Sequence, residues 1–131
     1  METRVVNPWT WQDSRGFVQA KEVVAASRTL YCAGQTSVDA DGRPLHEGDM
    51  EAQALQALDN LETVLEAAGY ALADVARLTV YVTDVDAYRE AAPAVGALLS
   101  RAGVRHGATL VGVAQLALPE LLVEFEATAV R

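Results

Sequence analysis

Residues 49–69, DMEAQALQALDNLETVLEAAG, form the most regular stretch of this sequence. Apolar side chains recur there at the spacing of one helix face, at Ala54, Leu58, Leu61, Leu65 and Ala68. Asp49 can accept hydrogen bonds from the free N–H groups of a first helical turn, and Gly69 suits the left-handed position that follows many helices. We therefore predict a helix from Asp49 to Ala68, with Leu58 and Leu61 buried against a sheet.

The segments that follow carry a strand pattern and then a second helix pattern. Val75–Val82 is rich in β-branched residues, which is typical of a buried strand. Proline disrupts a helix interior. We therefore predict one turn near Val85–Arg89 and a main helix from about Ala91 to Ser100, with Pro93 in its first turn. Gly103 marks the end of this second helix.

Further strands are predicted towards both ends of the chain. Residues 108–113 and 121–130 form the last two, and the final one alternates between apolar and polar side chains, as a strand with one buried face does. Residues 16–26 indicate a strand or a hairpin, and residues 29–33 indicate another short strand before a turn at Asp41-Gly42. This order predicts one α+β domain over residues 1–131, with a mixed six-stranded sheet and both helices on one face.

The composition narrows the classes of function. The chain has 131 residues, of which 51% are apolar, and a net charge of -8. Such a charge repels phosphate backbones, so we expect no nucleic-acid partner. No segment has the length and apolarity of a membrane span, and Met1–Pro8 has no signal core, which predicts a cytoplasmic protein. One cysteine and two isolated histidines form no metal-binding motif, so we expect neither a metal nor another cofactor.

Short motifs from about Gly16 to Val130 occur in an order and spacing that resemble one family. They are Cys32-Ala33-Gly34-Gln35, Gly48-Asp49 with Gln53, Ala57-Leu58-Asp59-Asn60, Val64-Leu65, Ala67-Ala68-Gly69, Asp74-Val75, Thr79-Val80-Tyr81, Asp84 and Val123-Glu124-Phe125-Glu126-Ala127. Each motif alone is weak, but together they resemble the RidA (YjgF) family of reactive-intermediate imine deaminases. The resemblance covers nearly the whole chain.

This resemblance implies a chorismate-mutase-like fold and a homotrimer with active sites in the clefts between subunits. The deaminases of this family hydrolyse enamines and imines, such as 2-aminoacrylate, to 2-keto acids and ammonia. An arginine in a Pro-Ala-Arg-Ser/Thr stretch holds the substrate carboxylate, and a planar guanidinium suits that task because it offers two parallel donors.

The sequence departs from the family pattern at this arginine. The matching stretch is His106-Gly107-Ala108-Thr109, in which Ala108 stands at the arginine position. By the resemblance, Glu124 is the catalytic residue that positions or activates water. The resemblance also implies a set of positions that bind a small-molecule substrate: Phe17 (tyrosine in the family), Ala33 (serine in the family), Gly34, Gln35, Ala108 and Thr109. The missing polar groups imply weak or no ordinary 2-aminoacrylate deaminase activity.

Four charged or titratable residues at or near these positions have alternative interpretations. Glu124 and Glu126 lie two apart on a strand and face the same side, which is either solvent or a subunit cleft. His106 is either a general base, because imidazole titrates near neutral pH, or a solvated loop histidine, which we favour. Arg105 either reaches the cleft in place of the missing arginine or is a surface residue, and we favour the surface.

Other conspicuous side chains are expected to pack. Cys32 lies in an apolar run and is expected to be a small buried side chain. Trp9 and Trp11 are expected to cover a subunit edge or line the cleft. Tyr81 and Tyr88 lie in patterns typical of a core.

Three functions remain open at this stage. The first is a divergent hydrolase of a small imine, enamine or related C–N substrate. The second is a trimer that binds a small metabolite without converting it. The third is a nuclease, against which the acidic charge and the absence of a metal-binding histidine pair argue.

Overall fold

The computed structural model describes residues 1–131 and contains seven strands and two α-helices. In chain order they are β1 (Glu2–Val6), β2 (Ala20–Val24), β3 (Thr29–Tyr31), β4 (Gln35–Thr36), α1 (Met50–Ala67), β5 (Val75–Val82), α2 (Val85–Arg101), β6 (Gly107–Gly112) and β7 (Val123–Val130). Short 3-10 helices lie at Asp13–Arg15 and Leu72–Asp74. Neither α-helix has the length and apolarity needed to cross a membrane.

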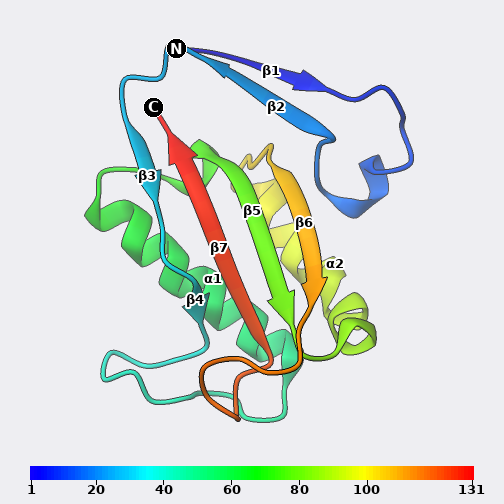
Figure 1. Cartoon of the computed structure of the whole chain (residues 1–131), viewed down its shortest axis with the longest axis vertical. Coiled ribbons are helices and arrows are strands. Elements are labelled where there is room, and N and C mark those ends of the chain that lie inside the picture. The colour runs from blue at the N-terminus through cyan, green and yellow to red at the C-terminus, as the bar shows by residue number, and fades with distance from the viewer.

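The main sheet is mixed and both helices cover one of its faces (Figure 1). Its strand order is β3–β7–β5–β6, and β4 pairs with the other end of β7 on the same side as β3. Only β5 and β6 run parallel, while the other pairs in this sheet are antiparallel. The predicted α+β architecture is confirmed, but the predicted six-stranded sheet is in fact a five-stranded sheet and a separate two-stranded ribbon of β1 and β2.

Helix α1 agrees closely with its prediction. Asp49 is its N-cap and its side chain accepts a hydrogen bond from the Ala52 N–H at 3.0 Å. Gly69 follows the C-cap with a φ of 78°, a left-handed conformation that favours glycine. Leu58 and Leu61 are fully buried, so the predicted face is the one that packs on the sheet.

Helix α2 is continuous, so the predicted break near its start was wrong. It runs from Val85 to Arg101 with Pro93 inside it, and Asp84 caps it by accepting from the Ala87 N–H at 3.0 Å. A proline removes the hydrogen bond to the carbonyl four residues earlier, which here belongs to Arg89. Both Pro93 and Arg89 are exposed, so water can satisfy that carbonyl and the helix can continue.

The sheet confirms the central strand predictions and corrects the N-terminal ones. β5 has the predicted bounds, and Val123, Phe125, Ala127 and Ala129 of β7 are all buried on the helix side. The strand predicted over residues 16–26 is regular only in β2, and its partner β1 was not predicted. The ribbon joins the main sheet where the Val18 N–H donates to the His106 carbonyl at 2.9 Å.

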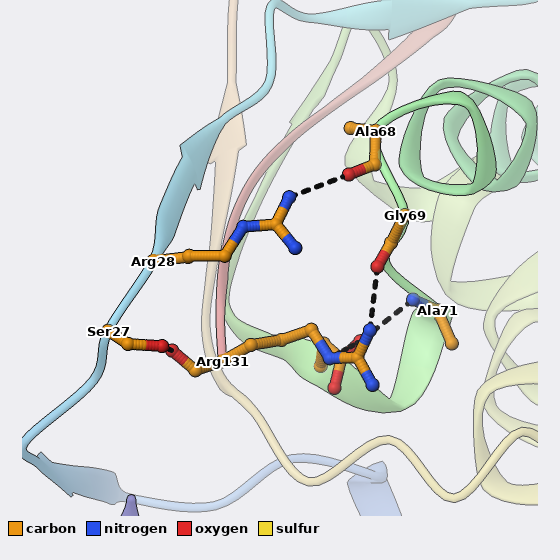
Figure 2. A network of polar contacts seen from close by, with 7 residues as sticks. Ser27, Arg28, Ala68, Gly69, Ala71 and Arg131 are labelled. Atoms are coloured by element: carbon orange, nitrogen blue, oxygen red, sulfur yellow. Dashed lines mark hydrogen bonds and ion pairs between the residues drawn. The ribbon is translucent and has the colours of Figure 1, made fainter.

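Polar contacts join the start of β3 and the C-terminus of the chain to the C-terminal end of α1 (Figure 2). The guanidinium of Arg28 donates to the Ala68 carbonyl at 3.0 Å, and that of Arg131 donates to the Gly69 carbonyl at 2.7 Å. Arg131 also lies 3.6 Å from the carboxylate of Asp74. Helix C-terminal carbonyls lack partners within the helix, so these arginines satisfy the end of α1 and have a structural role.

Candidate functional site

Glu124 and Gly34 are in direct contact across the pairing of β4 with β7. Thr36 of β4 is the register partner of Glu124, and the backbone at Gly34, just before β4, lies against that carboxylate. A Cβ added to Gly34 would overlap Oε1 of Glu124 and lie 2.6 Å from its Cδ. Any side chain at position 34 would therefore displace the Glu124 carboxylate from its present place.

Glu124 lies on the sheet face that the helices leave uncovered. Tyr81 of β5 is its register partner, and Thr79 is the register partner of Glu126, so both glutamates project to the same face, as predicted. Partial burial, and then the nearby charge of Glu126, raise the pKa of Glu124 above its ordinary value. A carboxylate with a raised pKa is a better base, and once protonated it can return the proton to a reacting group.

Three further predicted site residues adjoin this carboxylate or the strand that carries it. Gln35 of β4 pairs with Phe125 in register, and its side-chain amide donates to the Ala33 carbonyl at 3.2 Å. Ala33 itself is exposed. Ala33, Gly34, Gln35 and Glu124 thus lie together, and we call them the Glu124 group.

The remaining predicted residues lie at the start of β6, and we call Phe17, Ala108 and Thr109 the Phe17 group. Phe17 adjoins Val18, which bridges to Gly107. Ala108 pairs with the buried Leu78, which places it on the helix side of the sheet, whereas Thr109 pairs with Thr79 on the open side. The Thr109 hydroxyl accepts a 2.6 Å hydrogen bond from the guanidinium of Arg77.

The two groups do not form one site within the chain. β4 and β6 are separated by β7 and β5, and neighbouring strands are ~4.8 Å apart, so Gln35 on β4 lies roughly 14 Å and Glu124 on β7 roughly 10 Å from β6 across the sheet. A substrate with a few heavy atoms cannot bridge these distances. Residues of both groups can meet around such a substrate only if each group comes from a different copy of the chain.

A cavity of about 440 Å³ lies beside the Phe17 group. The N-terminal segment supplies Asn7, Asp13 and Phe17 to its wall, the last turn of α2 supplies Ser100, and the connection to β6 supplies Arg105. Sequence analysis did not find Asn7 or Asp13, because no local pattern links them to a turn at the far end of the chain. Arg105 is exposed as predicted, and it faces this cavity.

His106 contradicts the prediction of a solvated loop histidine. Only 3% of the residue is accessible, and its Nδ1 is buried without a hydrogen-bond partner. Burial, together with the charge of Lys21, lowers the pKa of His106 to about 4. The sequence placed it in a loop, but the N-terminal segment covers that loop through the Val18 contact.

The other singled-out side chains divide between core and surface. Cys32 is buried, as predicted, and burial raises its thiol pKa. Tyr88 is buried too, which raises its pKa to about 12. Tyr81 does not lie in the core, because it is on the open face and its hydroxyl donates to Glu126 at 3.2 Å.

Both tryptophans are exposed in the single chain, and their place at a subunit edge or in the cleft stays a prediction. Trp9 and Trp11 are 58% and 55% exposed, although the Trp11 ring meets that of Phe17 edge-on at 5.9 Å. No cluster of three or more His, Cys, Asp or Glu side chains is arranged to hold a metal ion.

Residues 14–131 match the model of a family described as Endoribonuclease L-PSP, which is the family of RidA, YjgF and UK114. The chain belongs to the RidA family. Its fold is similar to that of a Rid-family protein of unknown function from Yersinia pestis, with 39% identity over 100% of both chains and a TM-score of 0.87.

Curated members of the RidA family match over a shorter segment. A RutC family protein from Pyrococcus horikoshii is 38% identical over 65 residues, which are 50% of this chain and 52% of that protein. The 2-iminobutanoate/2-iminopropanoate deaminase of Rattus norvegicus is 35% identical over 65 residues, 50% of this chain and 47% of the enzyme. These matches span about half the length of each relative. They therefore support membership of the family but do not identify a substrate of this chain.

Proposed function

We propose that this protein is a divergent RidA-type hydrolase that cleaves the C–N bond of a small imine or enamine. The observation that carries the proposal is the Gly34–Glu124 contact, where the absence of a side chain keeps a carboxylate with a raised pKa in a partly buried position. Deaminase activity in relatives that match half of the chain supports the same reaction class.

The proposed catalytic unit is a homotrimer with the site in the cleft between copies. The bare face of the sheet (Figure 1) and the separation of the Glu124 and Phe17 groups both support an assembly in which one copy completes the site of another. Sedimentation of the purified protein is expected to give three times the mass of the chain. A stable monomer at micromolar concentration would contradict this assembly.

In the proposed reaction, the carboxylate of Glu124 takes a proton from water while the water oxygen attacks the imine carbon. The C=N π electrons move to nitrogen, which takes a proton from a second water to give a carbinolamine. Protonated Glu124 then donates its proton to nitrogen, the C–N bond breaks and ammonia leaves, while the hydroxyl gives its proton to the hydroxide left by the second water, which forms the carbonyl product. One imine and one water thus yield one carbonyl compound and one ammonia.

The proposed substrate carries less negative charge than 2-aminoacrylate. Ala108 offers no donor to a carboxylate, and Phe17 and Ala33 lack the hydroxyls that the family places in its cleft. Burial of an uncompensated carboxylate in such a cleft is unfavourable. We therefore expect a preference for imines that are neutral or more apolar.

The test compares Glu124→Gln with the wild-type protein on imines generated in place. An amine oxidase supplies imines without a carboxylate, and release of the aldehyde is followed in excess over the spontaneous rate. General-base catalysis is typically worth about a hundredfold or more, so Glu124→Gln is expected to lose nearly all of the acceleration. An equal rate for the variant would contradict the role of Glu124, and Glu90→Gln, at an exposed glutamate on α2, is the control.

A further inference from the structure

The cavity beside β6 is lined by two side chains of opposite charge that make few contacts within the chain. The Arg105 guanidinium takes part in none of the four ion pairs of the chain. The Asp13 carboxylate receives a single side-chain hydrogen bond, from the amide of Gln12 at 3.2 Å. Both residues are exposed and line the same cavity, so each can meet a ligand.

Asp13 is held in place by buried amides. Gln12 is completely buried, and its Oε1 accepts from the Gln19 side chain at 3.2 Å while its Nε2 donates to Asp13. Asn7, another lining residue, accepts from the Gln19 N–H at 2.8 Å. Buried polar side chains cost free energy unless they are hydrogen-bonded. This chain of amides therefore fixes the N-terminal wall of the cavity and the carboxylate on it.

The rest of the wall consists of three apolar side chains, Ser100 and two glycines, and the size suits a small molecule. Phe17 is half-buried, while Val18 and Val104 are buried. The volume of about 440 Å³ falls within the ~300–1,000 Å³ range of ligand sites. A cation, an anion and an apolar wall together match a ligand that has a carboxylate, an ammonium group and an apolar side chain.

We propose that this cavity binds a small apolar α-amino acid as a zwitterion, with Arg105 holding the carboxylate and Asp13 the ammonium group. Along the strands, the register separates Gly107, next to the cavity, from the level of Glu124 by four residues, or roughly 13 Å. Ala108 and Thr109 do not line the cavity. The proposal does not depend on hydrolysis at Glu124.

The cavity belongs only partly to the region that matches the family. The family match begins at residue 14, so Asn7 and Asp13 lie outside it. The Yersinia pestis relative covers the whole chain, including these residues. The zwitterion site is therefore expected in those relatives that share this N-terminal segment and have both Asp13 and Arg105.

Calorimetric titration with L-leucine tests the proposal, with 4-methylpentanoate and isoamylamine as probes that each lack one charge. Arg105→Gln is expected to weaken L-leucine and 4-methylpentanoate by about tenfold or more, since a charged hydrogen bond is worth ~1.5–3 kcal/mol. Asp13→Asn is expected to weaken L-leucine but not 4-methylpentanoate. Arg101→Gln and Asp41→Asn, which change exposed residues outside the cavity, are the controls.

Each outcome decides the proposal. No binding of L-leucine at millimolar concentration, or equal binding by Arg105→Gln and the controls, would overturn it. Thermal unfolding of each variant confirms that the fold is intact. Glu124→Gln is expected to bind L-leucine like the wild-type protein, so loss of hydrolysis and loss of the zwitterion site are distinguishable.

Discussion

The two faces of the main sheet differ in what they contain and in what a change there is expected to do. The face covered by α1 and α2 is lined by apolar side chains such as Leu58, Leu78 and Phe125, all of them buried. The open face carries Arg77, Tyr81, Glu124 and Glu126. Side chains on the covered face of the sheet thus stabilise the fold, while those on the open face remain accessible to a ligand or a second copy of the chain.

The arginines of the chain differ in whether they have hydrogen-bond or ion-pair partners within it. At the C-terminal end of α1, Arg28 and Arg131 each donate to backbone carbonyls and have a structural task (Figure 2). At the approach to β6, Arg105 has no such partner in the chain. Arg28 and Arg105 are both exposed, yet they have different roles. The hydrogen-bond partners of Arg28 within the chain distinguish the two.

The largest expected effect is on the covered face. Leu58→Ala removes a fully buried side chain and leaves a cavity between α1 and the sheet. Such a change is expected to lower the free energy of unfolding by about 2–5 kcal/mol. Val64→Ala, on the exposed side of the same helix, is the control. Chemical denaturation measures both, and similar midpoints for the two variants would show that the covered face is assigned wrongly.

His106 differs from the side chains of the covered face because it is polar and titratable, although it is buried like them. The folded state lowers the pKa of His106 to about 4 from its usual 6.5. The unfolded chain therefore takes up this proton first, and stability is fully present above pH ~6.5 and is lost as the pH falls through the folded pKa. The loss attributable to His106 is roughly 3 kcal/mol at the acid end of this window.

Denaturation across this pH range measures the effect. His106→Leu is expected to remove that part of the pH dependence, while His46→Asn, at an exposed histidine with a left-handed φ of 60° that asparagine tolerates, leaves it unchanged. An acid dependence that persists in full in His106→Leu would assign it to other groups.

The smallest expected effect lies on the open face. The charge of Glu126 contributes to the raised pKa of Glu124, so Glu126→Gln is expected to lower the pKa of Glu124. Stability is expected to change by no more than about 0.5 kcal/mol, as is usual for exposed positions. Carboxyl NMR titration of the two proteins measures the shift, and an unchanged or higher Glu124 pKa would contradict the arrangement of the two glutamates.

The sequence was most informative where the signal is local. The caps and apolar spacing of α1, the bounds of β5 and the alternation of β7 were all predictable, because each depends on neighbours within a few residues. The break predicted between Arg89 and Ala91 was wrong because the exposure of Arg89 and Pro93, which lets the helix continue, is a tertiary property. The burial of His106 depends on Val18, which is distant in sequence.

The candidate site was predictable only in part for the same reason. Glu124 could be assigned to one face of β7 from a period of two, and Gly34 from its motif. The contact between them follows from the pairing of β4 with β7, which no local pattern encodes. Asn7 and Asp13 meet Arg105 only in the folded chain.

The proposed difference from ordinary family deaminases rests on Ala108, which stands where the family pattern has an arginine, and one assay tests this directly. An amino-acid oxidase or a threonine dehydratase generates the imine of a 2-keto acid in place, and keto-acid release is followed with this protein and with a RidA-family member that carries the arginine. A charged hydrogen bond to the carboxylate is worth about 1.5–3 kcal/mol, and a bidentate pair more. We therefore predict turnover of 2-aminoacrylate and 2-iminobutyrate at least about a hundredfold below that of the arginine-bearing protein. Equal rates would contradict the account, and loss of that activity in Arg105→Ala would then identify Arg105 as the substitute.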